Sequence, residues 1–233
     1  MEIISIRNGF TSDHSSTSYE FLAVDKALGK KERNAVASLS SRADPTSRRV
    51  SFTYNVDGYD IPGGWESLME NYYDIMYREE YGWWTLALGF QSKPGQINEL
   101  KKYEFTGEDD LGTEVSENSG RIVVVINCRV DMAYVDEPDE DYYDNDEEEE
   151  ELEDEEPNND RAVFVSEDPL LNLLVQVRNQ LIDGDYRVLY ALWEKYRYPD
   201  EEEFKEEDYE APPAPSKKAA GSAIVEQFIN MLE

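Results

Sequence analysis

Ile122-Val123-Val124-Val125-Ile126 is an unbroken run of β-branched residues. Such a run is typical of a strand that is buried on both faces of a sheet, because consecutive side chains of a strand point to opposite faces. Residues 50–56 instead alternate between apolar and polar side chains, which predicts a half-buried strand with one face in solvent. The two segments predict a sheet in which residues 122–126 form a central strand.

Further strands and helices are expected before this central run. Strands are predicted at residues 19–24 and 83–90, and amphipathic or short helices at residues 30–40, 65–79 and 97–103. Residues 107–120 are polar and are predicted to form a loop. In the strand at 83–90, the even-numbered positions are apolar, so Trp83 falls on the other face and either packs under a helix or is exposed.

A helical hairpin is expected towards the C-terminal end. Asp168-Pro169 combines a preferred N-cap residue with proline at the first helical position, and a Gly184 turn separates this helix from a second one. A short strand is predicted just before it, at residues 161–166. Residues 222–232 form an amphipathic segment that packs either on this chain or in a groove of a partner.

These elements predict an α+β fold: a mixed or antiparallel sheet of four to six strands with helices on one face, plus a helical hairpin. The expected organisation has five parts. They are an α+β body at 1–135, an acidic disordered insertion at 136–160, a strand and helical hairpin at 161–198 that complete the same domain, an acidic and proline-rich linker at 199–221, and an amphipathic helix at 222–233.

The most acidic part of the chain is the segment 136–156, in which 16 of 21 positions are Asp or Glu. Its like charges repel one another and it has few apolar residues, so it is expected to be disordered or extended. Two interpretations remain open for this acidic segment. It is either a solvated spacer or a docking arm, and in the second case Tyr142 and Tyr143 would add apolar contacts.

The formal net charge of −31 restricts the possible partners. It argues against direct binding of nucleic acid phosphates and of anionic membranes, both of which require a basic surface. A basic protein or a basic protein surface is the expected partner, because the charge attracts it over a long range. Cytoplasmic localisation is expected, since residues 1–10 lack the features of a signal peptide and no segment is apolar enough to span a membrane.

The chemistry-bearing residues do not form a recognisable catalytic motif. His14 is the only histidine and Cys128 the only cysteine, so neither a zinc tetrad nor a disulfide within the chain is expected. No calcium-loop pattern and no phosphate-binding glycine loop is present, and no metal or cofactor is predicted. An enzyme would have to use carboxylates and tyrosines, for which Glu20, Asp25, Tyr54 and Tyr72 are the candidates.

Several segments resemble a family of uncharacterised bacterial proteins. They are Tyr19-Glu20-Phe21-Leu22-Ala23-Val24-Asp25-Lys26, Leu39-Ser40-Ser41-Arg42-Ala43, the strand at 52–55, Leu68-Met69 with Tyr72, and Gly184-Asp185-Tyr186-Arg187-Val188-Leu189-Tyr190. Arg7-Asn8-Gly9-Phe10 with Ser15-Ser16-Thr17 is similar to a motif that opens other such proteins. The resemblance over residues 19–197 implies a bacterial origin and one evolutionary unit, with the acidic segment as an insertion. It implies no activity and no functional residue.

The leading hypothesis is a non-enzymatic interaction module that binds a basic partner, as a subunit or regulator of a bacterial complex. The alternatives are an inhibitor that mimics nucleic acid and an enzyme that uses carboxylates and tyrosines. The candidate partner-binding residues combine acidic and aromatic groups with the last amphipathic segment. They are Tyr142, Tyr143, Glu147, Glu148, Glu149, Glu150, Trp83, Ile224, Phe228, Ile229 and Leu232.

Overall fold

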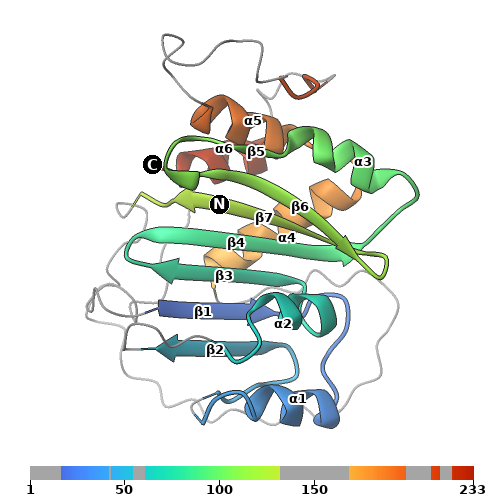
Figure 1. The fold of residues 1–233 in the computed structure, drawn as a ribbon, viewed down its shortest axis with the longest axis vertical. Coiled ribbons are helices and arrows are strands. Elements are labelled where there is room, and N and C mark those ends of the chain that lie inside the picture. The colour runs from blue at the N-terminus through green and yellow to red at the C-terminus, as the bar shows by residue number, and fades with distance from the viewer. Residues whose placement is uncertain (1–16, 42, 55–60, 132–167, 198–210, 216–221) are drawn as a thin grey trace.

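A seven-stranded antiparallel sheet with the strand order β2-β1-β3-β4-β7-β6-β5 organises this computed structural model (Figure 1). The structure describes residues 17–41, 43–54, 61–131, 168–197, 211–215 and 222–233. The strands are β1 (Thr17–Leu22), β2 (Arg49–Tyr54), β3 (Ile75–Glu80), β4 (Trp83–Gln91), β5 (Phe105–Thr106), β6 (Gly112–Asn118) and β7 (Arg121–Arg129). Every strand pair in these segments is antiparallel.

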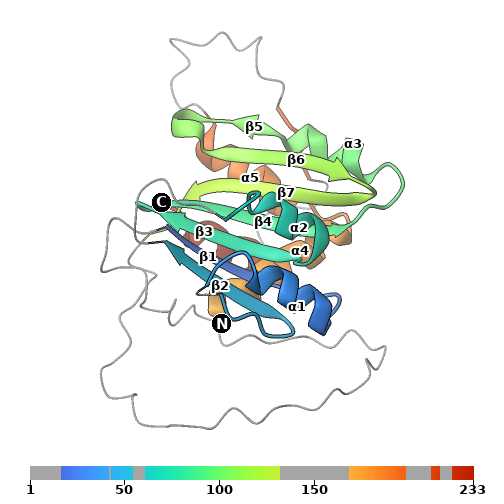
Figure 2. The same ribbon diagram turned by 60° about the horizontal axis from the view of Figure 1, so that its bottom comes forward.

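Helices lie on both faces of the sheet (Figures 1 and 2). They are α1 (Lys30–Ala37), α2 (Glu66–Asn71), α3 (Gln96–Leu100), α4 (Pro169–Ile182), α5 (Arg187–Tyr196) and α6 (Ala223–Asn230), with 3-10 turns η1 (Lys101–Tyr103) and η2 (Glu108–Asp110). One apolar cluster joins the sheet to α4, α5 and α6, and a second joins it to α1 and α2. None of the helices in the described segments is long and apolar enough to cross a membrane.

The α+β class and the antiparallel sheet are confirmed, whereas two details of the predicted fold are wrong. The sheet has seven strands instead of four to six, and helices cover both faces instead of one. The second error has a physical reason that is visible in β1. Leu22 packs with the α4 cluster, while Tyr19 and Phe21 pack with the α1 and α2 cluster, so both faces of this strand are buried.

The central strand is where the sequence places it. In β7, Ile122, Val124 and Ile126 are fully buried towards α4, and Val123 is buried on the opposite face. Strand β2 shows the predicted alternation, with Val50 and Phe52 buried.

Two segments have a different structure from the one predicted. The helix predicted at 65–79 ends at Asn71, and its second half is β3. Ile75, Met76 and Tyr77 are all fully buried, so β3 has no alternation that would distinguish it from a helix. The loop predicted at 107–120 contains β6, whose Glu114 and Ser116 are exposed because no described helix covers that part of the sheet.

The helical hairpin begins as predicted. One carboxylate oxygen of Asp168 accepts hydrogen bonds from the backbone N–H groups of Leu170 (2.9 Å) and Leu171 (3.1 Å), and Pro169 is the first helical residue. The predicted insertion at 136–160 and the strand predicted at 161–166 lie outside the described residues. Of the linker at 199–221, only residues 211–215 are described.

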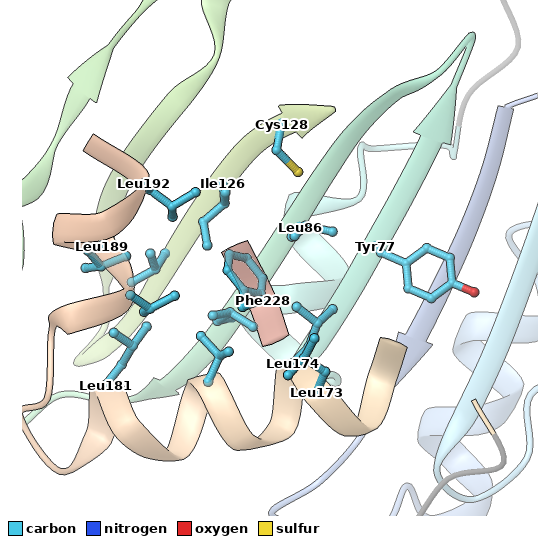
Figure 3. Close-up of a cluster of buried hydrophobic side chains, with 14 of the residues drawn as sticks. Tyr77, Leu86, Ile126, Cys128, Leu173, Leu174, Leu181, Leu189, Leu192 and Phe228 are labelled. Carbon is cyan, nitrogen blue, oxygen red and sulfur yellow. The ribbon is translucent and has the colours of Figure 1, made fainter. Parts of the chain in front are cut away.

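The last helix packs on this chain. Phe228 of α6 lies between α4 and the sheet in Figure 3 and is fully buried, together with Met231. Leu232 forms a β-bridge with Val130, and the backbone N–H of Asp131 donates to the carbonyl oxygen of Met231 (2.9 Å). Of the two arrangements left open by the sequence, the structure has the intramolecular one.

Asp74, between α2 and β3, links the end of β1 to both helical layers. One of its carboxylate oxygens accepts hydrogen bonds from the backbone N–H groups of Val24 (2.7 Å) and Asp25 (2.8 Å). The other lies 2.8 Å from Nη2 of Arg121 and 3.6 Å from Nη2 of Arg178. Arg178 is a buried residue of α4, and Asp25 forms a second ion pair with it.

We expect Phe228→Ala to lower the free energy of unfolding by about 3–5 kcal/mol, because it removes a fully buried aromatic ring and leaves a cavity. Urea denaturation followed by tryptophan fluorescence measures this change. The matched control is Glu226→Ala on the exposed side of α6, which should stay within about 0.5 kcal/mol of wild type. An equal effect of both substitutions would contradict the packing of α6 on this chain.

We expect Asp74→Ala to lower the free energy of unfolding by about 3–5 kcal/mol, because it removes a carboxylate shared by two largely buried guanidinium groups. The same denaturation assay applies. Asp44→Ala replaces an exposed aspartate and should change stability by less than about 0.5 kcal/mol. A mild effect of Asp74→Ala would show that Arg121 and Arg178 are satisfied without this carboxylate.

Candidate functional site

The β3–β4 hairpin presents two aromatic side chains at its tip. Tyr81 and Gly82 form the two-residue connection, and both have positive φ angles, of 53° and 80°. This geometry is typical of the tight turns that match the twist of a hairpin, and it is unfavourable for a residue such as tyrosine. Tyr81 is 50% exposed and Trp83, at the start of β4, is 40% exposed. They are the exposed large hydrophobic side chains of the described segments.

Trp83 is held in place by a residue of the neighbouring strand. Arg129 is its register partner on β7, and the guanidinium carbon lies 4.2 Å from the centre of the indole ring. Nη2 of Arg129 also lies 3.2 Å from a carboxylate oxygen of Asp109 in η2. A cation–π contact supported by an ion pair fixes one face of the indole ring and leaves the rest of the side chain at the surface.

Carboxylates surround these aromatic groups. Glu79 accepts a hydrogen bond from the backbone N–H of Gly82 (2.9 Å), and the adjacent Glu80 accepts one from the hydroxyl of Thr17 (3.1 Å). We use the name hairpin-tip surface for Glu79, Tyr81, Trp83, Asp109 and Arg129. Its combination of exposed aromatic rings and carboxylates is suited to contact with cationic side chains.

On the face of the sheet that carries Trp83, no described helix covers the part of β4 and β7 beside the hairpin-tip surface, whereas α4, α5 and α6 cover the opposite face. At the opposite end of β4 and β7, Arg121 donates to the carbonyl oxygens of Met69 (2.8 Å) and Tyr73 (2.7 Å), which places α2 over that end. Thr85 and Asn127, two register steps from the pair of Trp83 and Arg129, are half-buried and bonded to each other at 3.1 Å. Figure 1 shows this part of β4 and β7 extending beyond α2.

The other predicted partner-binding residues are not part of this surface. Tyr142, Tyr143 and Glu147 to Glu150 lie outside the described residues. Phe228 of α6 and Leu232, which follows α6, are buried in the core of this chain. Ile224 and Ile229 of α6 pack against the same cluster and are partly exposed. A partner could therefore reach Phe228 and Leu232 only if α6 left the core.

Four ionisable side chains form a buried cluster near the start of α4. Nε of Arg49 lies 2.9 Å from Glu20, Nη2 of Arg49 lies 3.4 Å from Asp168, and the hydroxyl of Tyr77 donates to Asp168 at 2.9 Å. Glu20, Tyr77 and Asp168 are each at most 4% exposed. The cluster attaches the capped end of α4 to β1, β2 and β3.

Burial dominates the acid–base properties of this cluster. It raises the pKa of Glu20, although the nearby Arg49 guanidinium acts in the opposite direction. Burial next to Asp168 also raises the pKa of Tyr77 well above its ordinary value. Elsewhere in the core, burial raises the pKa of the Cys128 thiol, so this cysteine is not an activated nucleophile.

The carboxylate and tyrosine candidates for an active site do not converge. Glu20 faces α4, whereas Tyr54 and Tyr72 pack against the cluster on the opposite face of the sheet. Asp25 lies after β1, where it pairs with Arg178. Two cavities in the described segments, of about 420 and 310 Å³, lie beside the α4–α5 turn and share Asp183 and Asp185 as lining residues. They contain none of these candidates.

Sequence reasoning missed most of the residues that organise these clusters. The predictions from the sequence do not include Asp74, Arg121, Arg178 or Arg49. Of the cluster at α4, they include only Glu20 and the capping role of Asp168. Arg178 had a signal, since it is the one charged residue of the largely apolar α4, and a buried cation needs a partner. Arg129 had none, because its contact with Trp83 depends on the pairing of β4 with β7.

Comparison of the sequence with models of known protein families and with curated proteins finds no match. In the part of the chain that the structure describes, no group of three or more His, Cys, Asp or Glu side chains is arranged to hold a metal ion.

We expect Glu20→Gln to change how stability depends on pH. The pKa of Glu20 is higher in the folded protein than in the unfolded chain, so the folded protein binds the Glu20 proton more tightly. The contribution of Glu20 to the free energy of unfolding therefore falls as pH rises from the ordinary glutamate pKa to the raised pKa. Glutamine lacks this effect, so wild type should gain stability relative to Glu20→Gln as pH falls through that window. Urea denaturation at a series of pH values from about 4 to about 8 measures the difference.

Glu117→Gln, which changes an exposed glutamate on β6, is the matched control and should stay within about 0.5 kcal/mol of wild type at each pH. A difference between Glu20→Gln and wild type that does not vary with pH would show that burial does not govern the titration of Glu20.

Proposed function

We propose that this protein is a non-enzymatic interaction module that binds a lysine- and arginine-rich surface of another protein. The hairpin-tip surface provides the specific contacts, and the acidic segment 136–156 provides attraction. The observation that carries this proposal is the exposure of Trp83 and Tyr81, at 40% and 50%, beside carboxylates. Tryptophan, tyrosine and arginine are the residue types that most often dominate binding energy in protein interfaces.

The geometry of Trp83 supports a contact surface that is ordered before binding. Arg129 covers one face of the indole ring at 4.2 Å and is itself paired with Asp109. A side chain that is already fixed loses little conformational freedom when a partner arrives, so less of the contact energy is lost to ordering. The exposed part of the indole ring is the place where a cationic or apolar side chain of a partner can pack.

The net charge of −31 supports the choice of a basic partner. Long-range attraction increases the rate of encounter with a positively charged surface and weakens as salt is added. The acidic segment begins seven positions after Arg129, a length that spans at most about 25 Å. Its first carboxylates are therefore tethered within reach of the hairpin tip, and a partner bound at Trp83 would meet both.

We expect a fluorescently labelled peptide of alternating lysine and arginine residues to bind the full chain, with an affinity that falls steeply between low and high salt. Trp83→Ala should weaken binding by about 5- to 30-fold, which corresponds to about 1–2 kcal/mol, because it removes the cation–π surface. Fluorescence anisotropy measures the affinity, and circular dichroism checks that the variant is folded.

The chain offers a matched control in Trp193, a half-buried residue of α5 whose ring lies under Arg197 at 4.9 Å. Trp193→Ala should leave peptide affinity unchanged. Absence of binding by wild type at low salt would overturn the proposal, and equal losses for Trp83→Ala and Trp193→Ala would overturn the role of the hairpin-tip surface.

A further inference from the structure

A group of cations gathers on and beside α1, in a chain that is otherwise strongly acidic. Lys26, Lys30, Lys31 and Arg33 lie within eight consecutive positions, and Glu32 is the only carboxylate among those positions. Lys26, Lys30 and Lys31 are exposed, and Arg33 is half-buried. We call these four residues the basic α1 surface.

The stability of α1 does not account for these cations. Lys30 and Lys31 occupy the first two helical positions, where a positive charge opposes the helix dipole. Glu32 is the residue that suits this position, since it accepts a hydrogen bond from the backbone N–H of Gly29 (2.6 Å) and pairs with Lys26 (3.3 Å). Within the described segments, Lys30, Lys31 and Arg33 form no ion pair. The two lysines are therefore available to an anionic partner.

Asp168, the described residue that follows the acidic segment, lies near β2, the strand that adjoins α1. Asp168, the first described residue after the segment, lies 3.4 Å from Arg49 at the start of β2. Val36 of α1 packs in the same cluster as Val50 and Phe52 of β2, so α1 adjoins this strand. Since β2 is the terminal strand of the described sheet, the chain can pass from one face to the other around it.

The connection is also long enough. Eleven residues separate Glu156 from Asp168, and an extended chain of that length spans about 36–40 Å. A tethered group of this kind has an effective concentration in the millimolar range, which favours it over free anions in solution.

We infer that the acidic segment 136–156 docks on the basic α1 surface of its own chain. The contact is electrostatic, so it weakens as salt is added. The basic α1 surface then competes with the basic partner for the carboxylates of this segment, a consequence that rests on the proposed function. The basic α1 surface thus takes the place of the partner while no partner is bound.

A spin label on the acidic segment tests this docking in the full chain. Asn145→Cys adds a reactive site, and the native Cys128 is fully buried, so labelling is selective. At low salt, the label should broaden the backbone amide signals of α1 in a nitrogen-15 NMR spectrum, and high salt should restore them. Lys30→Glu combined with Lys31→Glu should abolish the broadening. Lys101→Glu combined with Lys102→Glu, which changes an exposed lysine pair on η1, should leave it intact.

Three outcomes would overturn the inference. The first is the absence of broadening in α1, and the second is equal broadening at α1 and at Lys101 and Lys102. The third is broadening in a mixture of spin-labelled chains and nitrogen-15-labelled chains, which would place the contact between two copies.

The NMR sample contains no basic peptide, so this test is independent of the proposed function. If α1 broadens but the peptide fails to bind, only the proposed function is wrong; if the peptide binds without broadening in α1, only the docking is wrong.

Discussion

Asp74 places one carboxylate between two arginines that come from opposite faces of the sheet. Arg121 reaches it from the side of α2, and Arg178 reaches it from α4. Charges in such a position are tolerated only when each is paired and hydrogen-bonded. Arg178 meets this condition by also donating to the carbonyl oxygen of Gly89 (2.6 Å). The shared carboxylate therefore fixes the position of both helical layers relative to the sheet.

The backbone around this carboxylate is adapted to the arginines. A Cβ atom at position 89 would lie 2.7 Å from Nη2 of Arg121, so glycine leaves the space through which that guanidinium reaches Asp74. The buried cluster of Glu20, Arg49 and Asp168 makes a second attachment, at the start of α4. The two clusters thus attach α4 to the sheet that carries Trp83 at its hairpin tip.

Local patterns in the sequence predicted elements that alternate between apolar and polar residues, that contain a long β-branched run, or that begin with a distinctive capping residue. The alternation of β2 and β4, the β-branched run of β7 and the Asp168 cap are of this kind. Strand β3 was missed because its buried residues are consecutive, and β6 because an uncovered strand near the margin of a sheet can be polar. The coverage of both faces and the contact of Arg129 with Trp83 depend on strand order, which local patterns do not contain. Trp83 was found as a candidate, but its supporting residues were not.

The bridge between Val130 and Leu232 has a consequence for the order in which the molecule is made. The sheet can pair as soon as β7 leaves the ribosome, yet the helices that cover Leu86 and Ile126 follow only after the acidic segment. The first of these helices, α4, begins at Pro169 and the last, α6, at Ala223, so one face of the new sheet is covered in stages and stays open to association with other nascent chains until then. Contacts between such distant positions also slow folding, and the core is complete only after α6 has been made.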